Sequence, residues 1–226
     1  MKKYYPLLQK SPLFSGLSAE ELAAMLGCLG AERCLAARNQ TIFSEGAPAG
    51  QLGLVLQGAV QIERIDYFGN RSILATREAG TLFGEAFACA QTERLPVSVV
   101  AMQESEIMLL DCRRVLTVCS SACSFHIRLV RNLLQAVAAS NLQLTQKLEF
   151  LSQRTTRKKL LTYLTAQAKA AGTEKFTIPF DRQALADYLE VERSAMSAEL
   201  SKLRKEGLLE YHKNHFRLLP HAFKSE

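Results

Sequence analysis

The longest regular pattern along the chain is a repeat of apolar positions inside a stretch, residues 119–169, that contains neither Gly nor Pro. Successive positions of the repeat alternate between steps of three and four residues. The positions are Ile127, Val130, Leu134, Val137, Asn141, Leu144, Leu148 and Leu151, and all but Asn141 are apolar. Such a repeat is the a/d seam of a coiled coil, which needs a second helix to cover it. It predicts a parallel homodimer with Asn141 fixing the register, and packing of the helix on its own domain is the alternative.

The pattern is different between about residues 33 and 112, where short apolar runs are separated by glycines. The runs 52–56 and 59–62 flank Gln57-Gly58, which predicts a tight hairpin. A second turn is predicted at residues 68–71, where Gly69-Asn70 interrupts the chain. Short strands at this spacing favour an antiparallel barrel or roll over βαβ units.

A helical region is predicted before this roll, over residues 11–30. Ser18 stands three residues before Glu21, which is the spacing of a capping box. Leu22, Met25 and Leu29 follow at helical spacing.

The last third of the chain predicts a winged helix-turn-helix. A helix from 157 to about 171 is followed by a short strand at 177–180. Asp181 then caps a helix over 182–189, and another helix runs from 193 to 206. The final segment, 208–219, is predicted to be a hairpin that turns at Lys213-Asn214.

The polar face of the second helix in this motif predicts contacts with DNA. Arg193 suits the edge of a guanine, and Ser194 and Ser197 lie on the same face one turn apart. Side chains expected to meet phosphate lie nearby on both helices, and these are Arg182, Gln183 and Lys202.

Composition and charge agree with this division. The chain has 226 residues and a net charge of +6. Residues 1–150 carry 14 Lys and Arg against 13 Asp and Glu, whereas residues 151–226 carry 14 against 9. A basic C-terminal part favours a polyanionic partner. The sequence has no run of about 18 apolar residues and no secretory h-region, so we expect a cytoplasmic protein with no membrane partner. It also has no nucleophile–base pair or phosphate loop, so we expect no enzyme activity.

The six cysteines have irregular spacings and predict no disulfide framework. Cys119 and Cys123 share a helical face and are candidates for a redox pair, although buried packing is the alternative. His126, close by, is a candidate haem ligand, with a structural role as the alternative. We predict no metal site, and the cofactor is left unassigned.

The chain resembles the cyclic-AMP receptor protein / fumarate-nitrate regulator (CRP/FNR) family over its whole length. The resemblance rests on segments 13–17 (LFSGL), 57–60 (QGAV), 80–85 (GTLFGE) and 181–197. It implies an α+β fold with a cyclic-nucleotide-binding-like β-roll over 1–118, a dimerisation helix over 119–152 and a winged helix-turn-helix over 153–226. It further implies a bacterial transcription regulator that binds a palindromic operator in double-stranded DNA as a homodimer. If the protein is an activator, RNA polymerase is a further partner.

The effector site departs from the family's cyclic-AMP-binding branch. The resemblance assigns the ribose contact to Glu85, after Gly84, and a purine contact to Asn141 or its neighbour. Leu95-Pro96 stands where the phosphate-pairing Arg and its small neighbour are expected, and Arg94 lies one residue away. We therefore expect a small-molecule effector other than cyclic AMP in the usual mode, such as another small anion or an apolar organic molecule. A haem- or cysteine-based sensor and an effector-independent interaction protein are the alternatives.

Overall fold

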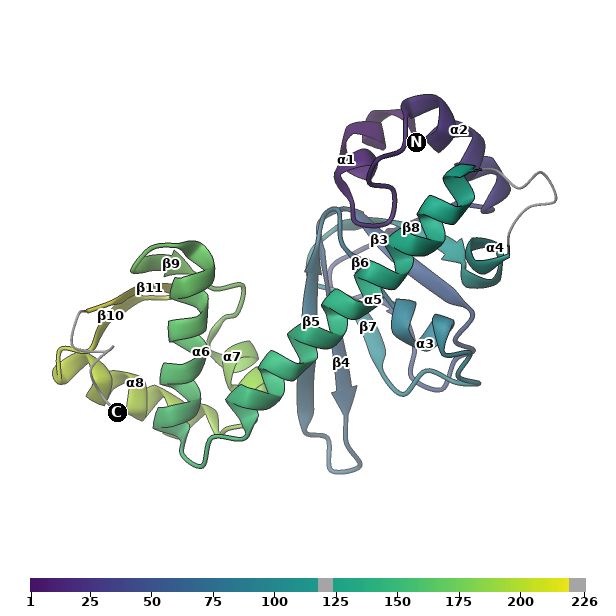
Figure 1. Ribbon diagram of the computed structural model, residues 1–226. Coiled ribbons are helices and arrows are strands. Elements are labelled where there is room, and N and C mark those ends of the chain that lie inside the picture. The colour runs from purple at the N-terminus through teal and green to yellow at the C-terminus, as the bar shows by residue number, and fades with distance from the viewer. Residues whose placement is uncertain (118–123, 220–226) are drawn as a thin grey trace. The chain divides into compact units, whose positions relative to one another are not determined.

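The computed structural model describes residues 1–117 and 124–219, and its contacts group the chain into two compact units. The first unit contains Met1–Phe68 and Leu74–Leu142. The second contains Gly69–Ile73 and the chain from Gln143 onward. Helix α5 (Ser124–Leu151) contributes residues to both units and is the longest helix in Figure 1.

Two four-stranded sheets with antiparallel pairing form the roll of the first unit (Figure 1). One sheet has the order β1 (Glu32–Ala36), β8 (Ser105–Asp111), β3 (Gln51–Gln57) and β6 (Leu82–Phe83). The other has the order β2 (Thr41–Phe43), β7 (Ser98–Ala101), β4 (Ala59–Ile65) and β5 (Arg71–Glu78). The predicted antiparallel roll is therefore confirmed.

The hairpin predicted at Gln57-Gly58 is wrong. Strands β3 and β4 are consecutive in the chain but belong to different sheets. Gly58 instead forms the corner between the sheets, with φ at +88° and so little space that a Cβ there would lie 2.3 Å from the Ser105 hydroxyl oxygen. The corner lets Val55 and Val60, on either side of it, enter the same buried cluster. The turn at 68–71 does join two neighbouring strands, β4 and β5, as predicted.

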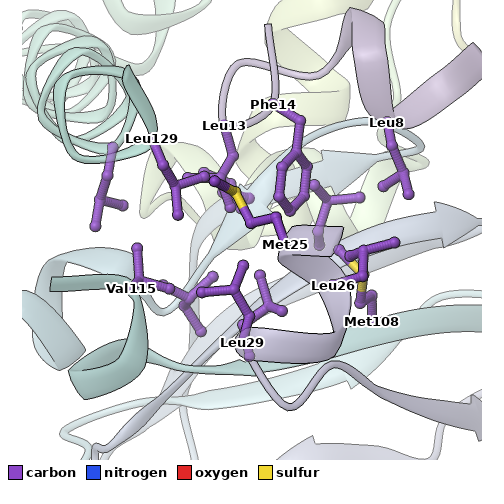
Figure 2. Packing of buried hydrophobic residues seen from close by; sticks show 14 of the residues in the cluster. Leu8, Leu13, Phe14, Met25, Leu26, Leu29, Met108, Val115 and Leu129 are labelled. Atoms are coloured by element: carbon purple, nitrogen blue, oxygen red, sulfur yellow. The ribbon is translucent and has the colours of Figure 1, made fainter. Parts of the chain in front are cut away.

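The helices of the first unit share a buried cluster with strands of the roll. They are η1 (Lys2–Tyr4), α1 (Tyr5–Lys10), α2 (Ala19–Cys28), α3 (Glu85–Cys89), α4 (Cys112–Leu116) and most of α5. Helix α2 begins with the predicted capping box of Ser18 and Glu21. Figure 2 shows Leu129 of α5 in the buried cluster beside Leu13 and Met25.

Helix α5 presents two different apolar faces. One face, with Leu129, Leu133 and Ala136, is buried in the core of the first unit. On the same side, the Asn132 amide donates to the carbonyl oxygens of Leu13 and Ser15, each at 2.9 Å. The seam positions lie elsewhere on the helix. Ile127, Leu134, Leu144 and Leu148 are exposed in the single chain, whereas Val130, Val137 and Leu151 are half-buried. Packing on its own domain therefore accounts for one face only, and the dimer remains a prediction for the other.

The second unit is a three-helix domain with a small sheet. Its elements are α6 (Thr156–Ala171), β9 (Lys175–Thr177), α7 (Arg182–Leu189), α8 (Arg193–Lys205), β10 (Leu209–His212) and β11 (His215–Leu218), with the sheet ordered β10-β11-β9. The Asp181 carboxylate accepts from the Ala184 backbone N–H at 2.8 Å and caps α7 as predicted. The strand predicted at 177–180 begins and ends earlier, since Phe176 pairs with Phe216 and Pro179 has no N–H for a ladder.

Helices α7 and α8 pack through the faces that the sequence predicts. Leu185 and Leu189 of α7 are fully buried in one cluster with Met196, Leu200 and Leu203 of α8. Strands β10 and β11 form the hairpin that was predicted to turn at Lys213-Asn214. The winged helix-turn-helix pattern is therefore confirmed.

Candidate DNA-binding surface and effector site

The first turn of α8 has an exposed polar face, and the opposite face of the helix is apolar and buried. Arg193 and Ser194 are exposed and Ser197, one turn further along, is half-buried. Lys202 is exposed near the other end and lies 3.8 Å from the Glu199 carboxylate. Because Met196 holds the opposite face in the core, the helix cannot turn its polar face inward without losing that burial. Arg193, Ser194 and Ser197 thus lie in the N-terminal part of α8, and contact of these side chains and of Lys202 with DNA stays a prediction.

The two candidate phosphate contacts on α7 are engaged within the domain. The Arg182 guanidinium carbon lies 4.6 Å from the ring centroid of Tyr211 and 5.2 Å from that of Phe216. Burial lowers the pKa of this guanidinium, and the neighbouring Tyr211 opposes the shift. The Gln183 amide donates to the Asp187 carboxylate at 2.7 Å. A role for either side chain in binding phosphate stays a prediction.

Sequence reasoning missed two basic residues that bear on the surface. Lys213 is exposed at the turn between β10 and β11 and has a φ of +53°. Arg157 of α6 forms ion pairs with Glu199, in the middle of α8, and with Glu206, the C-cap residue of α8, and so ties α6 to the second half of that helix. The turn signal at Lys213-Asn214 marked the first residue, whereas the second is defined by contacts across more than 40 positions in the sequence.

At the candidate effector site, Glu85 is tied to the long helix. Gly84, with φ at +77°, is the N-cap of α3, and Glu85 is the first residue of that helix. The Glu85 carboxylate is only 3% exposed and accepts a hydrogen bond from the Ser140 hydroxyl of α5 at 2.6 Å. Asn141, the other candidate, follows Ser140 on α5 and is exposed. Three of the four residues proposed for this site thus lie on α3, its cap and the adjoining stretch of α5.

Arg94 lies apart from that group. Its guanidinium is exposed and donates to the Gly46 carbonyl oxygen at 2.9 Å. Leu95, at the position where the family pattern expects a cation, is 4% exposed and belongs to an apolar cluster with Phe43 and Phe83. The Arg94 side chain therefore contacts the loop at Gly46, and the Leu95 side chain lies in the core.

Aromatic rings pack beside Gly84, the residue before Glu85. The centroids of Phe43 and Phe83 are 5.3 Å apart. The Phe83 ring packs directly against Gly53 of β3, where a Cβ would lie 2.1 Å from its Cζ atom. A Cβ on Gly84 would lie 3.1 Å from the Phe43 ring. The glycines at these two positions thus make room for the rings.

The structure describes the candidate haem ligand but not the candidate redox pair. Cys119 and Cys123 lie outside the described residues. His126 is buried, and its Nε2 atom lies 3.1 Å from the Val115 carbonyl oxygen, which links α5 to α4. This contact engages one of the two ring nitrogens, and a role of His126 in binding haem stays a prediction. No cluster of metal-ligating side chains occurs within residues 1–117 and 124–219.

The chain is similar to known proteins in both of its parts. Residues 35–122 match the family of cyclic nucleotide-binding domains, and residues 158–221 match the Crp-like helix-turn-helix domains. The nitrogen fixation regulation protein FixK of Azorhizobium caulinodans is 27% identical over 209 residues, which covers 88% of this chain and 80% of that protein. No helix in the described part of the chain is long and apolar enough to cross a membrane.

Two solved structures share the fold at 20% sequence identity. FixK2 from Bradyrhizobium japonicum has a TM-score of 0.68, with coverage of 86% of this chain and 96% of that one. The c-di-GMP responsive global regulator CLP of Xanthomonas campestris has a TM-score of 0.71, with coverage of 87% and 98%. The two matched domains follow each other in the order that the fold shows, and the FixK similarity spans both. The chain belongs to the CRP/FNR family, whose members are transcription regulators and not enzymes.

Proposed function

We propose that the chain binds a palindromic operator as a homodimer and that a signal received by the β-roll gates this binding. The observation that carries the DNA-binding proposal is the exposed first turn of α8, where Arg193 and Ser194 stand on a helix anchored by Met196. Arg193 would read a base edge, and Ser197 and Lys202 would extend the contact along the same helix. RNA polymerase is a further partner if the protein activates transcription.

The exposed seam of α5 supports the homodimer. Ile127 and Leu134 are 60% and 69% exposed in the single chain, and Leu148 is 65% exposed. Large apolar side chains in a row on one helix are usually covered by a partner. A second copy of α5 presents the same seam, with Asn141 opposite its equivalent.

The surroundings of Leu95 support an effector other than cyclic AMP in the family's usual mode. A cyclic phosphate placed there would lose its water and gain no cation, which costs several kcal/mol. Arg94 would have to leave the Gly46 carbonyl to compensate. Glu85 and Ser140 can still hold a hydroxyl or amine of a small ligand near Asn141. We propose a small organic molecule without a compact phosphate, or a signal that needs no ligand in the roll.

DNA binding is tested by selecting sites from a random duplex library and measuring their affinity by fluorescence anisotropy. Arg193→Ala should weaken the selected site by about 1–3 kcal/mol and relax the preference at one base pair. Lys202→Ala should weaken all sequences alike and reduce the salt slope by about 1. Arg38→Ala removes one exposed positive charge from the first unit and serves as the control. Unchanged operator binding by Arg193→Ala would show that α8 does not dock as proposed.

The effector proposal is tested by calorimetry with cyclic AMP and cyclic GMP. We expect no tight binding to the wild type or to Arg94→Ala. Binding in the low micromolar range that Arg94→Ala abolishes would show that Arg94 turns inward and supplies the missing cation. The protein would then be a cyclic-nucleotide receptor of the usual kind.

A further inference from the structure

Two cysteines of the first unit touch each other, and one of them lies on α3, the helix that begins at Glu85 of the candidate effector site. Cys89 is the last residue of α3 and Cys112 is the first residue of α4. Their Sγ atoms are 3.7 Å apart. Cys112 is 1% exposed and Cys89 is half-buried, so one thiol is in the core and the other is reachable from solvent. Both are free thiols.

We propose that Cys89 and Cys112 are a reversible dithiol–disulfide pair that supplies a redox input to the sensing unit. This inference rests on the proposed function, because it names one signal that gates DNA binding. The S–S bond of a disulfide is about 2.05 Å long, so the two sulfur atoms need to approach by little more than an ångström and a half. Neither helix has to unfold for this, since Cys89 ends its helix and Cys112 begins the other.

The reaction balances with a low-molecular-weight disulfide as oxidant. The Cys89 thiolate attacks one sulfur of glutathione disulfide, which releases one glutathione thiolate and leaves Cys89 in a mixed disulfide. Cys112 then loses its proton and attacks the Cys89 sulfur, which releases the second glutathione. Two protein thiols become one disulfide while one glutathione disulfide becomes two thiols, and the reverse exchange restores the reduced pair.

The surroundings set the order and the speed of this exchange. Burial raises the pKa of the Cys89 thiol, and it raises that of Cys112 further, to about 12. Cys89 is therefore the attacking residue and Cys112 the resolving one. Because little thiolate exists at neutral pH, the pair equilibrates slowly with the thiol pool rather than reacting in a fast burst.

Closing the disulfide acts on Glu85 through the short helix α3. Cys89 and Glu85 are the two ends of the five-residue α3. Glu85 accepts the hydrogen bond from Ser140 of α5, and the Cys112 backbone N–H is held by the Gly50 carbonyl at 3.1 Å. Drawing Cys89 toward this anchored residue displaces α3, so the position of the Glu85 carboxylate against Ser140 changes with the redox state.

The pair itself is tested by mass spectrometry on the full-length wild type. The reduced protein is equilibrated anaerobically with glutathione buffers of increasing oxidised fraction, and free thiols are then blocked. Trypsin places Cys89 in peptide 78–94 and Cys112 in peptide 95–113, each the only cysteine of its peptide. We expect a disulfide-linked pair of these two peptides that disappears on reduction. Absence of the linked pair at the most oxidising buffer would overturn the proposal.

The regulatory effect is measured as operator affinity in the reduced and the oxidised state. We expect the two dissociation constants of the wild type to differ by at least about fivefold, the lower end of usual coupling between sites. Cys89→Ser should abolish the difference, whereas Cys28→Ser, which removes an exposed thiol at the end of α2, should keep it. The double variant Cys119→Ser/Cys123→Ser should also keep it. A difference in operator affinity that persists in Cys89→Ser would refute the regulatory role of the pair. Equal affinities of the reduced and the oxidised wild type, with the linked peptides present in the oxidised sample, would refute it as well.

The two proposals fail in different ways. If the reduced protein selects no operator at all, the proposed function is wrong, and the peptide analysis still decides whether the pair forms. If the reduced protein binds an operator and the linked peptides never appear, the proposed function stands and the redox input is wrong.

Discussion

Replacing Leu134 with Glu tests the dimer helix directly. Leu134 is 69% exposed in the single chain and lies in the middle of the seam between Ile127 and Leu148. Fully burying a Leu side chain stabilises by about 1.5–3 kcal/mol, so covering the exposed two thirds is worth about 1–2 kcal/mol for each copy. Losing both copies removes about 2–4 kcal/mol, and two facing carboxylates in an apolar seam add a desolvation and repulsion cost. The dimer dissociation constant should therefore rise by at least about 100-fold.

Leu35→Glu is the matched control for this variant. Leu35 lies on β1 of the roll, is 65% exposed and is not part of the heptad repeat. The two variants make the same chemical change at side chains of nearly equal exposure, so a general effect of charge on association appears in both. Sedimentation velocity over a range of protein concentrations should show monomers for Leu134→Glu only. Thermal unfolding of the separate chains should differ little, because neither Leu is buried in the protomer.

Three results would refute this reasoning. The first is a wild type that sediments as a monomer at micromolar concentration. The second is Leu134→Glu remaining as dimeric as the wild type. The third is equal dissociation by both variants, which would place the interface on the roll as well as on the seam.

Three further predictions concern packing, pH and the aromatic contact of α7. Gly53→Ala should destabilise the first unit by about 1–3 kcal/mol in urea unfolding, because the new Cβ meets the Phe83 ring. The second change Phe83→Leu should recover part of the loss, whereas an unchanged stability of Gly53→Ala would contradict the close packing. Burial raises the pKa of the Cys112 thiol from 9.0 to about 12, so the folded state holds this proton more tightly than the unfolded state. The contribution of this thiol to the free energy of unfolding should be fully present below pH 9 and fall as the pH rises toward 12, and Cys112→Ala should flatten that decline. Arg182→Ala should lower the unfolding temperature of the second unit, because it removes about 1 kcal/mol of stacking on Tyr211. An unchanged unfolding temperature together with a flatter salt dependence of DNA binding would instead favour a phosphate contact.

The elements that the sequence predicts well are those defined by local signals. Helix α7 begins after Asp181 because that carboxylate satisfies an N–H of the first turn, and the signal lies within three residues. Met196, Leu200 and Leu203 of α8 fall into the core because their spacing is that of one helix face. The exposed seam of α5 follows from the same periodicity, read over a longer stretch.

The features that the sequence does not predict depend on contacts between distant positions. Short apolar runs on either side of Gly58 fit a hairpin as well as they fit a corner, and only the packing of two sheets decides between them. The N-terminal η1 and α1 carry little periodicity. They are held by contacts such as that of the Tyr4 hydroxyl, which donates to the Glu106 carboxylate at 2.6 Å across 102 positions. The pairing of Cys89 with Cys112 is equally invisible, because 23 residues separate them and no spacing rule connects them.

The two proposed signals converge on one point of α5 because of helix geometry. Consecutive residues of an α-helix project about 100° apart, so Ser140 faces the roll while Asn141 faces the seam. The 2.6 Å hydrogen bond from Ser140 to a buried carboxylate therefore fixes the rotation of the helix at the position where its one polar seam residue lies. A ligand that takes the Glu85 carboxylate and a disulfide that draws Cys89 toward α4 both change this contact, from opposite ends of α3. If both proposals hold, either event would act on the rotation of α5 at Asn141, the residue that we propose fixes the register of the dimer.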